Sequence, residues 1–367
     1  VLAGPACAYQ LALMGAEVIK VERPGRGDAM RHRSGTDPAR AAEGMSTAYL
    51  TQAAGKRSVT LDLETDDGRE KFDALLSGAD VLVENHRPST LARLGLVDLG
   101  TRFPRLVHCA VTGYGRGHRL EDAPAYDVNI QAASGLMALT GTKESGPTRV
   151  GAPVIDYATA LAAAFGVATA LLQRERTGQG SFVDISMMDV AFTLMSSTIV
   201  DHALTGHAPE RRGNAANSRS PSSGVFPCKT GHLSLGVNEE MHFVRLARAL
   251  GRAEWLDDPR FATVEARHAN KGALGDAISE RLKERTAMAW EEVLLADGVP
   301  AAMLRDLPDA VAQARRSGRP FLSPTGGQPT PVGAARVGET SSVLTTPERL
   351  GQSNEAELWT IDPDRAD

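Results

Sequence analysis

The first two hundred residues show two alternating hydrophobic patterns. Short runs rich in β-branched residues predict strands, and amphipathic or alanine-rich stretches between them predict helices. The predicted strands are 18–22, 57–63, 80–84, 106–112 and 182–186, and the predicted helices are 7–14, 67–79, 128–139, 157–176 and 188–204. Strands that alternate with helices in this way indicate an α/β fold with a parallel, doubly wound sheet.

The pattern changes after residue 204. Residues 205–227 are rich in Gly, Pro, Ser, Asn and Arg, which predicts a linker. Shorter strands and helices over 228–319 predict a smaller α+β domain. We therefore expect a large domain over 1–204, completed by part of 320–367, and a small domain after the linker.

Composition is that of an ordinary globular protein, with 42% hydrophobic and 23% charged residues. A net charge of -5 creates no global basic field, so we expect no nucleic-acid partner. The uncharged apolar run at 157–172 is shorter than the ~20 residues of a membrane-spanning helix, so we expect no membrane partner. Cys7, Cys109 and Cys228 are too far apart for a disulfide framework, which suits a reducing cytoplasm.

The motifs of several cofactor and enzyme classes are absent from the sequence. The glycine-rich stretch 113–117 follows a predicted strand but lacks the GxGxxG spacing, so we expect no NAD site. The nine histidines are scattered without an HExxH motif, which predicts no metal site. Neither a Walker A sequence nor a GxSxG elbow is present.

Basic side chains gather near the ends of the predicted strands. They are Arg23, Arg26, Arg31 and Arg33 after the strand at 18–22, Lys56 and Arg57 at the start of the next strand, and His86 and Arg87 after the strand at 80–84. Loops that follow parallel strands line the ligand crevice of such a sheet. A solvated surface charge is the simpler interpretation of any one residue, but the set favours a polyphosphate ligand.

Several segments, in order along the chain, share the motifs of one known family. They are VLAGPACAYQLALMGAEVIKVERPGRGD, GKRSVTLDL, ADVLVENHRPSTLARLGL, AYDVNIQAASGLMALTG, RVGAPVIDYATAL, TGQGSFVDISMMD, RRGN and LDDPRFATVEARHANKGAL. These segments resemble class III CoA-transferases of the CaiB/BaiF type, the family of carnitine CoA-transferase and formyl-CoA transferase. The resemblance covers roughly residues 1–285. It implies a Rossmann-like large domain, a small domain and an interlocked homodimer in which each chain passes through the other.

The resemblance also implies a site for coenzyme A or an acyl-CoA, close to the basic residues. The residues that match the family's CoA contacts are Val1, Arg23, Leu61, Asn85, His86, Arg87, Arg93 and Leu94. Relatives often carry Phe at the position of His86. The glycine-rich loop of oxalate-using relatives has no counterpart in LGVNEEMHF, which disfavours oxalate as the acceptor acid.

Asp156 precedes the alanine-rich helix predicted at 157–176. Periodicity alone favours a helix N-cap, which is worth about 1 kcal/mol. The positive end of the helix would also keep the carboxylate ionised at neutral pH. The resemblance implies that Asp156, at the end of RVGxxxxD, is the catalytic nucleophile. It would form mixed anhydrides and an enzyme-bound CoA thioester during transfer between an acyl-CoA and a carboxylic acid, without metal or NAD.

Two other functions stay open. An α-methylacyl-CoA racemase would carry His where this chain has Tyr126, and a phenol with a pKa near ~10 is a poor substitute for that base. The second alternative is a CoA-binding protein without catalytic activity. Binding an anionic ligand, however, gives no reason for a carboxylate at position 156.

Overall fold

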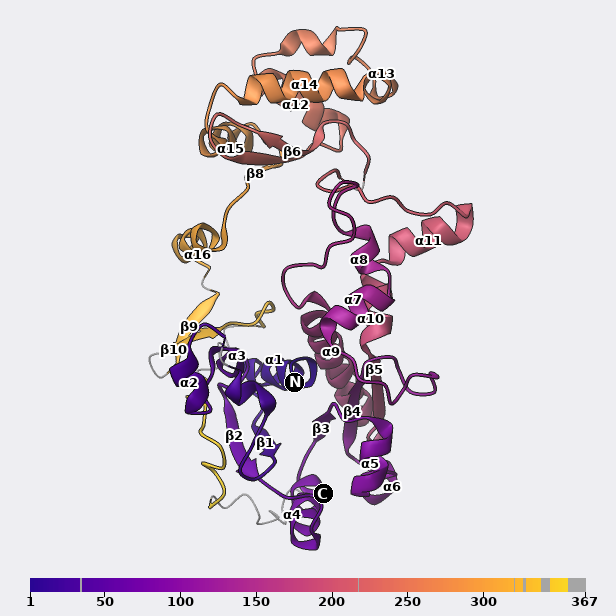
Figure 1. Cartoon of the computed structure of the whole chain (residues 1–367), viewed down its shortest axis with the longest axis vertical. Coiled ribbons are helices and arrows are strands. Elements are labelled where there is room, and N and C mark those ends of the chain that lie inside the picture. The colour runs from indigo at the N-terminus through magenta and orange to yellow at the C-terminus, as the bar shows by residue number, and fades with distance from the viewer. Residues whose placement is uncertain (34, 217, 320, 326–327, 338–343, 356–367) are drawn as a thin grey trace. The chain divides into compact units, whose positions relative to one another are not determined.

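The computed structural model describes residues 1–33, 35–216, 218–319, 321–325, 328–337 and 344–355 (Figure 1). The chain divides into two compact units. The first unit comprises Val1–Ala138, Thr148–Pro209 and Arg319–Asp367, and the second comprises Leu139–Pro147 and Glu210–Gly318.

The strands of the first unit pair mainly in parallel. They are β1 (Val18–Glu22) with β2 (Lys56–Thr60), then β3 (Val81–Glu84), β4 (Val107–Thr112) and β5 (Phe182–Ser186), and the antiparallel hairpin of β9 (Leu322–Thr325) and β10 (Gln328–Pro331). The sequence predicts a single parallel sheet. Among the described residues β1 and β3 do not pair, so the parallel strands form two sheets, ordered β1-β2 and β3-β4-β5.

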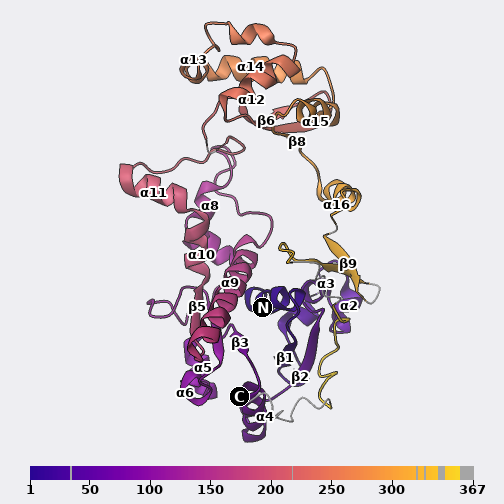
Figure 2. The ribbon, with the colours of Figure 1, turned by 180° about the vertical axis from the view of Figure 1, so that it is seen from behind.

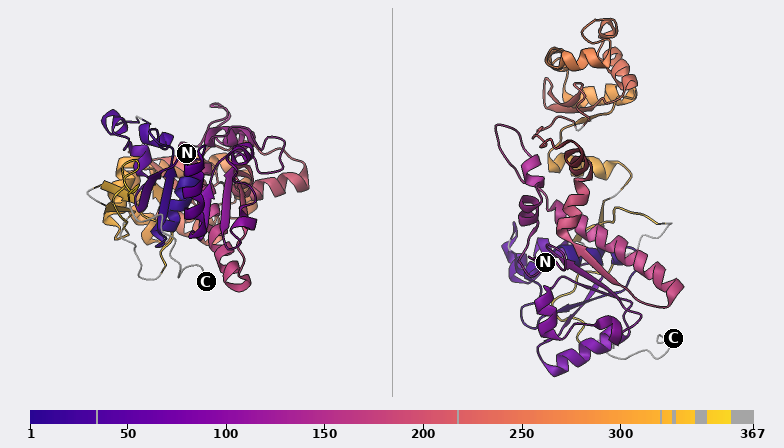
Figure 3. Two further views of the ribbon diagram at one scale, coloured as in Figure 1. Left: turned by 90° about the horizontal axis from the view of Figure 1, so that it is seen from below. Right: turned by 90° about the vertical axis from the view of Figure 1, so that its right-hand side faces the viewer.

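The core of the first unit surrounds β4 and the long helix α9 (Val154–Thr177). Every residue of β4 is buried, because β4 is the central strand of its sheet. Figures 2 and 3 show α9 running beside α1 (Ala3–Leu13) and packing on the strands. Small residues make this approach possible: a Cβ on Gly166 would lie 2.9 Å from Val183.

Shorter helices complete the first unit. They are η1 (Ala29–His32), α2 (Pro38–Ala42), α3 (Thr47–Leu50), α4 (Asp66–Ser77), α5 (Pro88–Leu94), α6 (Leu99–Arg102), α7 (Asp127–Ala133), α8 (Leu136–Leu139, at the boundary between units), α10 (Met187–Leu194) and α11 (Ser196–Thr205). The helix predicted over 128–139 is two helices, α7 and α8. Gly135 separates them because its φ of +89° is not helical.

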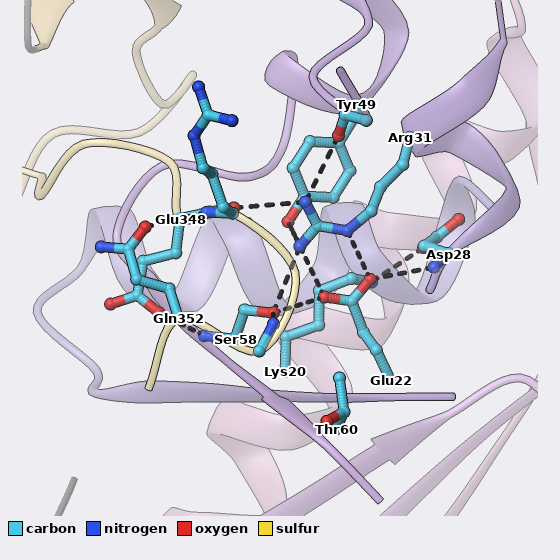
Figure 4. A network of polar contacts seen from close by, with 12 residues as sticks. Lys20, Glu22, Asp28, Arg31, Tyr49, Ser58, Thr60, Glu348 and Gln352 are labelled. Carbon is cyan, nitrogen blue, oxygen red and sulfur yellow. Dashed lines mark hydrogen bonds and ion pairs between the residues drawn. The ribbon is translucent and has the colours of Figure 1, made fainter. Parts of the chain in front are cut away.

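A segment near the C-terminus lies against β2 (Figure 4). The Ser58 amide donates to the Glu348 carboxylate at 2.6 Å, and the Ser353 amide donates to the Ser58 carbonyl at 3.0 Å. These contacts attach residues 344–355 to the first unit, whereas 356–367 lie outside the described residues.

The second unit has an antiparallel sheet and its own hydrophobic core. Its elements are β6 (Ser223–Pro227), β7 (His232–Gly236), α12 (Glu240–Ala249), η2 (Ala253–Leu256), α13 (Val264–Ala269), α14 (Lys271–Leu282), α15 (Ala287–Ala296), β8 (Ala301–Met303) and α16 (Leu307–Arg316). Trp290 is buried at the centre and donates to the Leu282 carbonyl at 2.8 Å. Residues 223–227, which the sequence predicts as part of a linker, form β6 because they pair with β7.

Candidate functional site

A cavity of about 630 Å³ opens in the first unit where α1, α7 and α9 begin and β3 and β4 end. This volume is within the usual range for small-molecule sites. The cavity contains three arginines and three carboxylates, namely Arg33, Arg87, Arg149, Glu121, Asp127 and Asp156. Its position at the carboxyl ends of parallel strands is the usual one for a ligand site in an α/β fold.

Asp127, the first residue of α7, caps the start of α9. Its Oδ2 accepts hydrogen bonds from the amides of Ile155 at 2.7 Å and Asp156 at 3.1 Å. Its Oδ1 accepts from the Gln131 side chain at 2.5 Å. Asp156 itself is the third residue of α9, and the residue before the helix, Pro153, has no side-chain cap. The prediction that Asp156 is the N-cap is therefore wrong, because another helix supplies the capping carboxylate.

The Asp156 carboxylate receives no hydrogen bond from any described residue. Burial, followed by the negative charge of Asp127, raises the pKa of Asp156 to about 6. The expected effect of the helix terminus is thus outweighed, although the carboxyl group is still mostly ionised at pH 7. A carboxylate held in a cavity without donors to its oxygens has the environment of a nucleophile rather than that of a structural ion pair.

Four of the eight expected CoA-site residues line the same cavity: Val1, Asn85, His86 and Arg87. The last three form the turn after β3. The Glu84 carboxylate accepts from the His86 amide at 2.6 Å, which fixes the conformation of this turn. Asn85 also lies close to α1, because a Cβ on Gly4 would be 3.4 Å from the Asn85 Cβ.

The other four expected residues lie outside the cavity as it is shaped here. Leu61 and Leu94 are buried in a hydrophobic cluster with Phe72. Arg93 is exposed and forms an ion pair with Glu64 at 2.8 Å. Arg23 is exposed in the loop after β1.

Two of the basic residues near the strand ends are buried and contact other protein groups, so they are not available to bind a ligand. Arg31 is 1% exposed, and its guanidinium lies 2.6 Å from the Glu22 carboxylate. Figure 4 shows the two side chains joined in a network of polar contacts. Lys56 is buried, its Nζ donates to the Pro5 carbonyl at 2.5 Å, and burial lowers its pKa well below the usual range. The interpretation of the whole basic set as a polyphosphate site is therefore wrong for these two residues.

Three charged residues of the cavity are not among the site residues that the sequence predicts, namely Glu121, Asp127 and Arg149. Asp127 has a sequence signal, since it is an acid at the start of a predicted helix. The described residues contain no group of three His, Cys, Asp or Glu side chains that could hold a metal ion.

Comparison with known proteins identifies the family. Residues 1–351 match the model of CoA-transferase family III. The chain is 37% identical to succinyl-CoA–D-citramalate CoA-transferase of Chloroflexus aurantiacus, over 83% of this chain and 75% of that protein. It is 33% identical to acetyl-CoA:oxalate CoA-transferase of Acetobacter aceti, over 92% of this chain and 86% of that protein.

The fold agrees with this assignment. A solved structure of a CaiB/BaiF family protein from Brucella suis superposes with a TM-score of 0.85 and 29% identity, covering 98% of this chain and 96% of the other. The chain therefore belongs to CoA-transferase family III and is an enzyme that transfers coenzyme A between an acyl-CoA and a carboxylic acid.

Proposed function

We propose that the enzyme transfers coenzyme A through covalent intermediates on Asp156. The observation that carries this proposal is the Asp156 carboxylate, which lies in the cavity, accepts no hydrogen bond from the described residues and has a pKa raised to about 6 by burial. Such a group is ionised at neutral pH yet poorly solvated, and both properties favour attack on a thioester carbonyl.

The reaction needs four exchanges between a carboxylate and a thiolate. An Asp156 oxygen attacks the donor thioester carbonyl, the C–S bond breaks, and a mixed anhydride and the CoA thiolate form. The thiolate attacks the Asp156 carbonyl carbon and releases the donor acid, which leaves an aspartyl-CoA thioester. The acceptor carboxylate attacks this thioester, and the released thiolate then attacks the acceptor acyl carbon to give the product and free Asp156. No net proton transfer or redox step occurs, so neither a metal nor NAD is needed.

Asp127 favours the covalent intermediates in two ways. By accepting the Ile155 and Asp156 amides, it holds the start of α9 in place, so that Asp156 stays at one position in the cavity. Its negative charge also disfavours the free Asp156 carboxylate, and that repulsion is relieved whenever Asp156 is an anhydride or a thioester. Both effects use contacts that lie within the first unit.

We propose that the acyl-CoA enters along the turn after β3, past Val1, Asn85, His86 and Arg87. The CoA phosphates would then face Arg23, Arg87 and Arg93, while Leu61 and Leu94 support this surface from the core. The α/β first unit is in this proposal the Rossmann-like, CoA-binding domain. The two relatives named above act on citramalate and oxalate, which makes dicarboxylic acids the first acceptors to test.

We further propose that a second copy of the chain covers the apolar surface of α9 and α11 in an interlocked homodimer. Among the described residues, α9 is the one helix long and apolar enough to cross a membrane, with 33% of its most apolar window buried. Phe165 is 76%, Leu172 is 58% and Leu204 is 82% exposed, so these helices have a large uncovered surface.

A cytoplasmic dimer explains this surface without a membrane, because α9 also packs on β4 and β5 of its own unit. Light scattering is expected to show a dimer in the absence of detergent. A stable monomer at micromolar concentration would contradict the proposal.

Trapping the covalent intermediate tests the mechanism directly. Hydroxylamine should inactivate the wild-type enzyme only after incubation with an acyl-CoA, and peptide mass spectrometry should find a hydroxamate at Asp156. Asp156→Asn should bind CoA with nearly the wild-type affinity and show no modification. Modification at another residue, or full transferase activity of Asp156→Asn, would overturn the proposal.

The racemase alternative requires a base at the position of Tyr126. This side chain lines the cavity and is 55% exposed. A phenol is a weak base at neutral pH, so we expect no exchange of the α-proton of a 2-methylacyl-CoA with heavy water at a rate comparable to acyl transfer.

A further inference from the structure

The cavity contains two cations for which the mechanism above gives no role. Arg33 and Arg149 both line it, together with Asp156. Among the described residues no carboxylate forms an ion pair with either arginine, whereas Arg31 and Arg93 in the same unit are paired with Glu22 and Glu64. Both arginines are exposed residues at the wall of the cavity that contains Asp156. Two cations without a carboxylate partner in this cavity indicate that it accepts an anion in addition to CoA.

Arg33 is attached to a rigid support. It directly follows η1, where Asp28 accepts the Met30 amide at 2.8 Å. The buried Arg31 anchors this turn, because its guanidinium donates to Glu22 and to Tyr49, each at 2.6 Å (the contacts are drawn in Figure 4). A residue two positions after such an anchor is restricted in where its side chain can reach.

The Arg33 guanidinium lies at the wall of the cavity near Tyr126. Its Cζ is 6.0 Å from the centre of the Tyr126 ring. Its charge also acts on Asp156, where it opposes the rise in pKa that burial and Asp127 cause. Arg33 is therefore close to the nucleophile and comes from a different element than the proposed CoA turn after β3.

The acyl group must occupy this part of the cavity when it is joined to Asp156. One carboxyl group of the substrate reacts at Asp156, so any second carboxylate of the same molecule lies farther along the cavity. A monocarboxylic acid would leave the Arg33 charge without a partner, whereas a dicarboxylic acid would provide one. We propose that Arg33, assisted by Arg149, binds the distal carboxylate, and that the enzyme uses dicarboxylic acyl groups. This inference rests on the proposed covalent function of Asp156.

Substrates matched in carbon number test this assignment. Succinyl-CoA and butyryl-CoA serve as the donor pair, and glutarate and valerate serve as the acceptor pair. Arg33→Gln should raise the KM for succinyl-CoA and glutarate roughly tenfold or more, the factor for one charge-assisted contact. It should change the values for butyryl-CoA and valerate by less than about twofold. Arg33→Lys should restore part of the loss, and Arg149→Gln should give a smaller loss of the same kind.

Arg69→Gln is the matched control, because Arg69 is a half-buried arginine of α4 that does not line the cavity and pairs with Asp66. It should leave all four values unchanged. An equal rise in KM for both donors on Arg33→Gln would place Arg33 at the CoA phosphates and overturn the assignment. A wild-type enzyme that uses valerate as well as glutarate would also overturn it.

Calorimetric titration of glutarate into the CoA-bound enzyme separates this inference from the transfer mechanism. Glutarate binding that is weakened by Arg33→Gln supports the carboxylate site even if hydroxylamine trapping finds no intermediate at Asp156. Trapping at Asp156 combined with Arg33-independent glutarate binding would instead retain the mechanism and reject the carboxylate site.

Discussion

Glu22 and Asp156 are two carboxylates of the same unit with opposite environments. Glu22 is 5% exposed and accepts hydrogen bonds from the Arg31 guanidinium, the Ser58 hydroxyl and the Asp28 amide. Burial alone would raise the pKa of Glu22, but the hydrogen bonds from Arg31 lower it below its ordinary value. Asp156 is also partly buried, accepts no hydrogen bond from the described residues, and has a raised pKa.

The difference shows what each carboxylate contributes. A buried charge whose oxygens are all satisfied contributes to a defined structure, and here it fixes the loop between β1 and α2. A carboxylate that is desolvated without a partner is unfavourable for folding but reactive. Each carboxylate can be tested separately by substitution of that residue or of its partner.

Asp156→Asn should have the largest effect. We expect the transferase rate to fall by at least about a thousandfold, because the amide cannot form the anhydride. The folding stability of the variant, by contrast, should increase. Because the pKa of Asp156 is raised in the folded state, ionisation of this group lowers the free energy of unfolding. This loss develops as the pH rises from the unfolded pKa near 4 to the folded pKa of about 6. The variant should therefore be more stable than wild type at pH 7, on the order of 2 kcal/mol.

Thermal unfolding across pH checks this second effect. The stability difference between Asp156→Asn and wild type should be small near pH 4, grow up to about pH 6 and then stay constant. A variant that is less stable than wild type at pH 7 would show that Asp156 has a structural role after all.

Arg31→Met should have the next largest effect, now on the paired carboxylate. It leaves Glu22 buried without its partner, and breaking such a pair costs about 3–5 kcal/mol of unfolding free energy. Arg93→Met is the control, since the Arg93–Glu64 pair is exposed and its loss should cost less than about 1 kcal/mol. Denaturant unfolding measures the free energy of unfolding of both variants. An equal decrease in the two would contradict the conclusion that the buried pair contributes more to stability than the exposed pair.

The Glu22–Arg31 pair should also stop contributing to the free energy of unfolding in acid. Because the pKa of Glu22 is lowered in the folded state, its stabilising effect is present above the unfolded pKa of ~4.3 and is lost as the pH falls through the folded pKa. The stability gap between wild type and Arg31→Met should therefore narrow in acid.

Local sequence patterns predicted the alternating strands and helices of the first unit, because each element follows from its own periodicity. They could not predict that Arg31 is buried and ion-paired while Arg33 lines the cavity, because the two residues lie only two positions apart in the same segment. The partners around the buried Arg31 include the Glu348 carbonyl, 317 residues away in the sequence, which accepts from its guanidinium at 3.2 Å. The cap of α9 is equally non-local, since Asp127 lies 28 residues before Ile155. Family resemblance predicts Asp156 as the nucleophile, and this role stays a prediction. The structure adds that Asp156 lines the cavity and that its carboxylate accepts no hydrogen bond from the described residues.

The same comparison between paired and unpaired charges applies to the arginines proposed to bind CoA. Among the described residues no carboxylate forms an ion pair with Arg23 or Arg87, whereas Arg93 is paired with Glu64. Arg23→Ala and Arg87→Ala should each raise the KM for acyl-CoA about tenfold, as expected for loss of one charge-assisted contact. Arg93→Ala should have a smaller effect, because CoA must compete with Glu64. Steady-state kinetics at several salt concentrations measure these changes, and unchanged values for Arg23→Ala and Arg87→Ala would place the CoA elsewhere.

Asp127→Asn should have the smallest effect, and it tests the link between the two carboxylates of the cavity. Asparagine keeps an oxygen that can accept the Ile155 and Asp156 amides, at the cost of the hydrogen bond from Gln131, but it removes the negative charge. The pKa of Asp156 should then fall below about 6, because the repulsion from Asp127 is lost while burial remains. The midpoint of the acidic limb of the kcat/KM profile should move to lower pH by up to about one unit.

Asp127→Ala should instead destabilise the protein by about 1 kcal/mol through loss of the cap. A purely structural Asp127 would leave the midpoint of the Asn variant in place while lowering the rate at every pH.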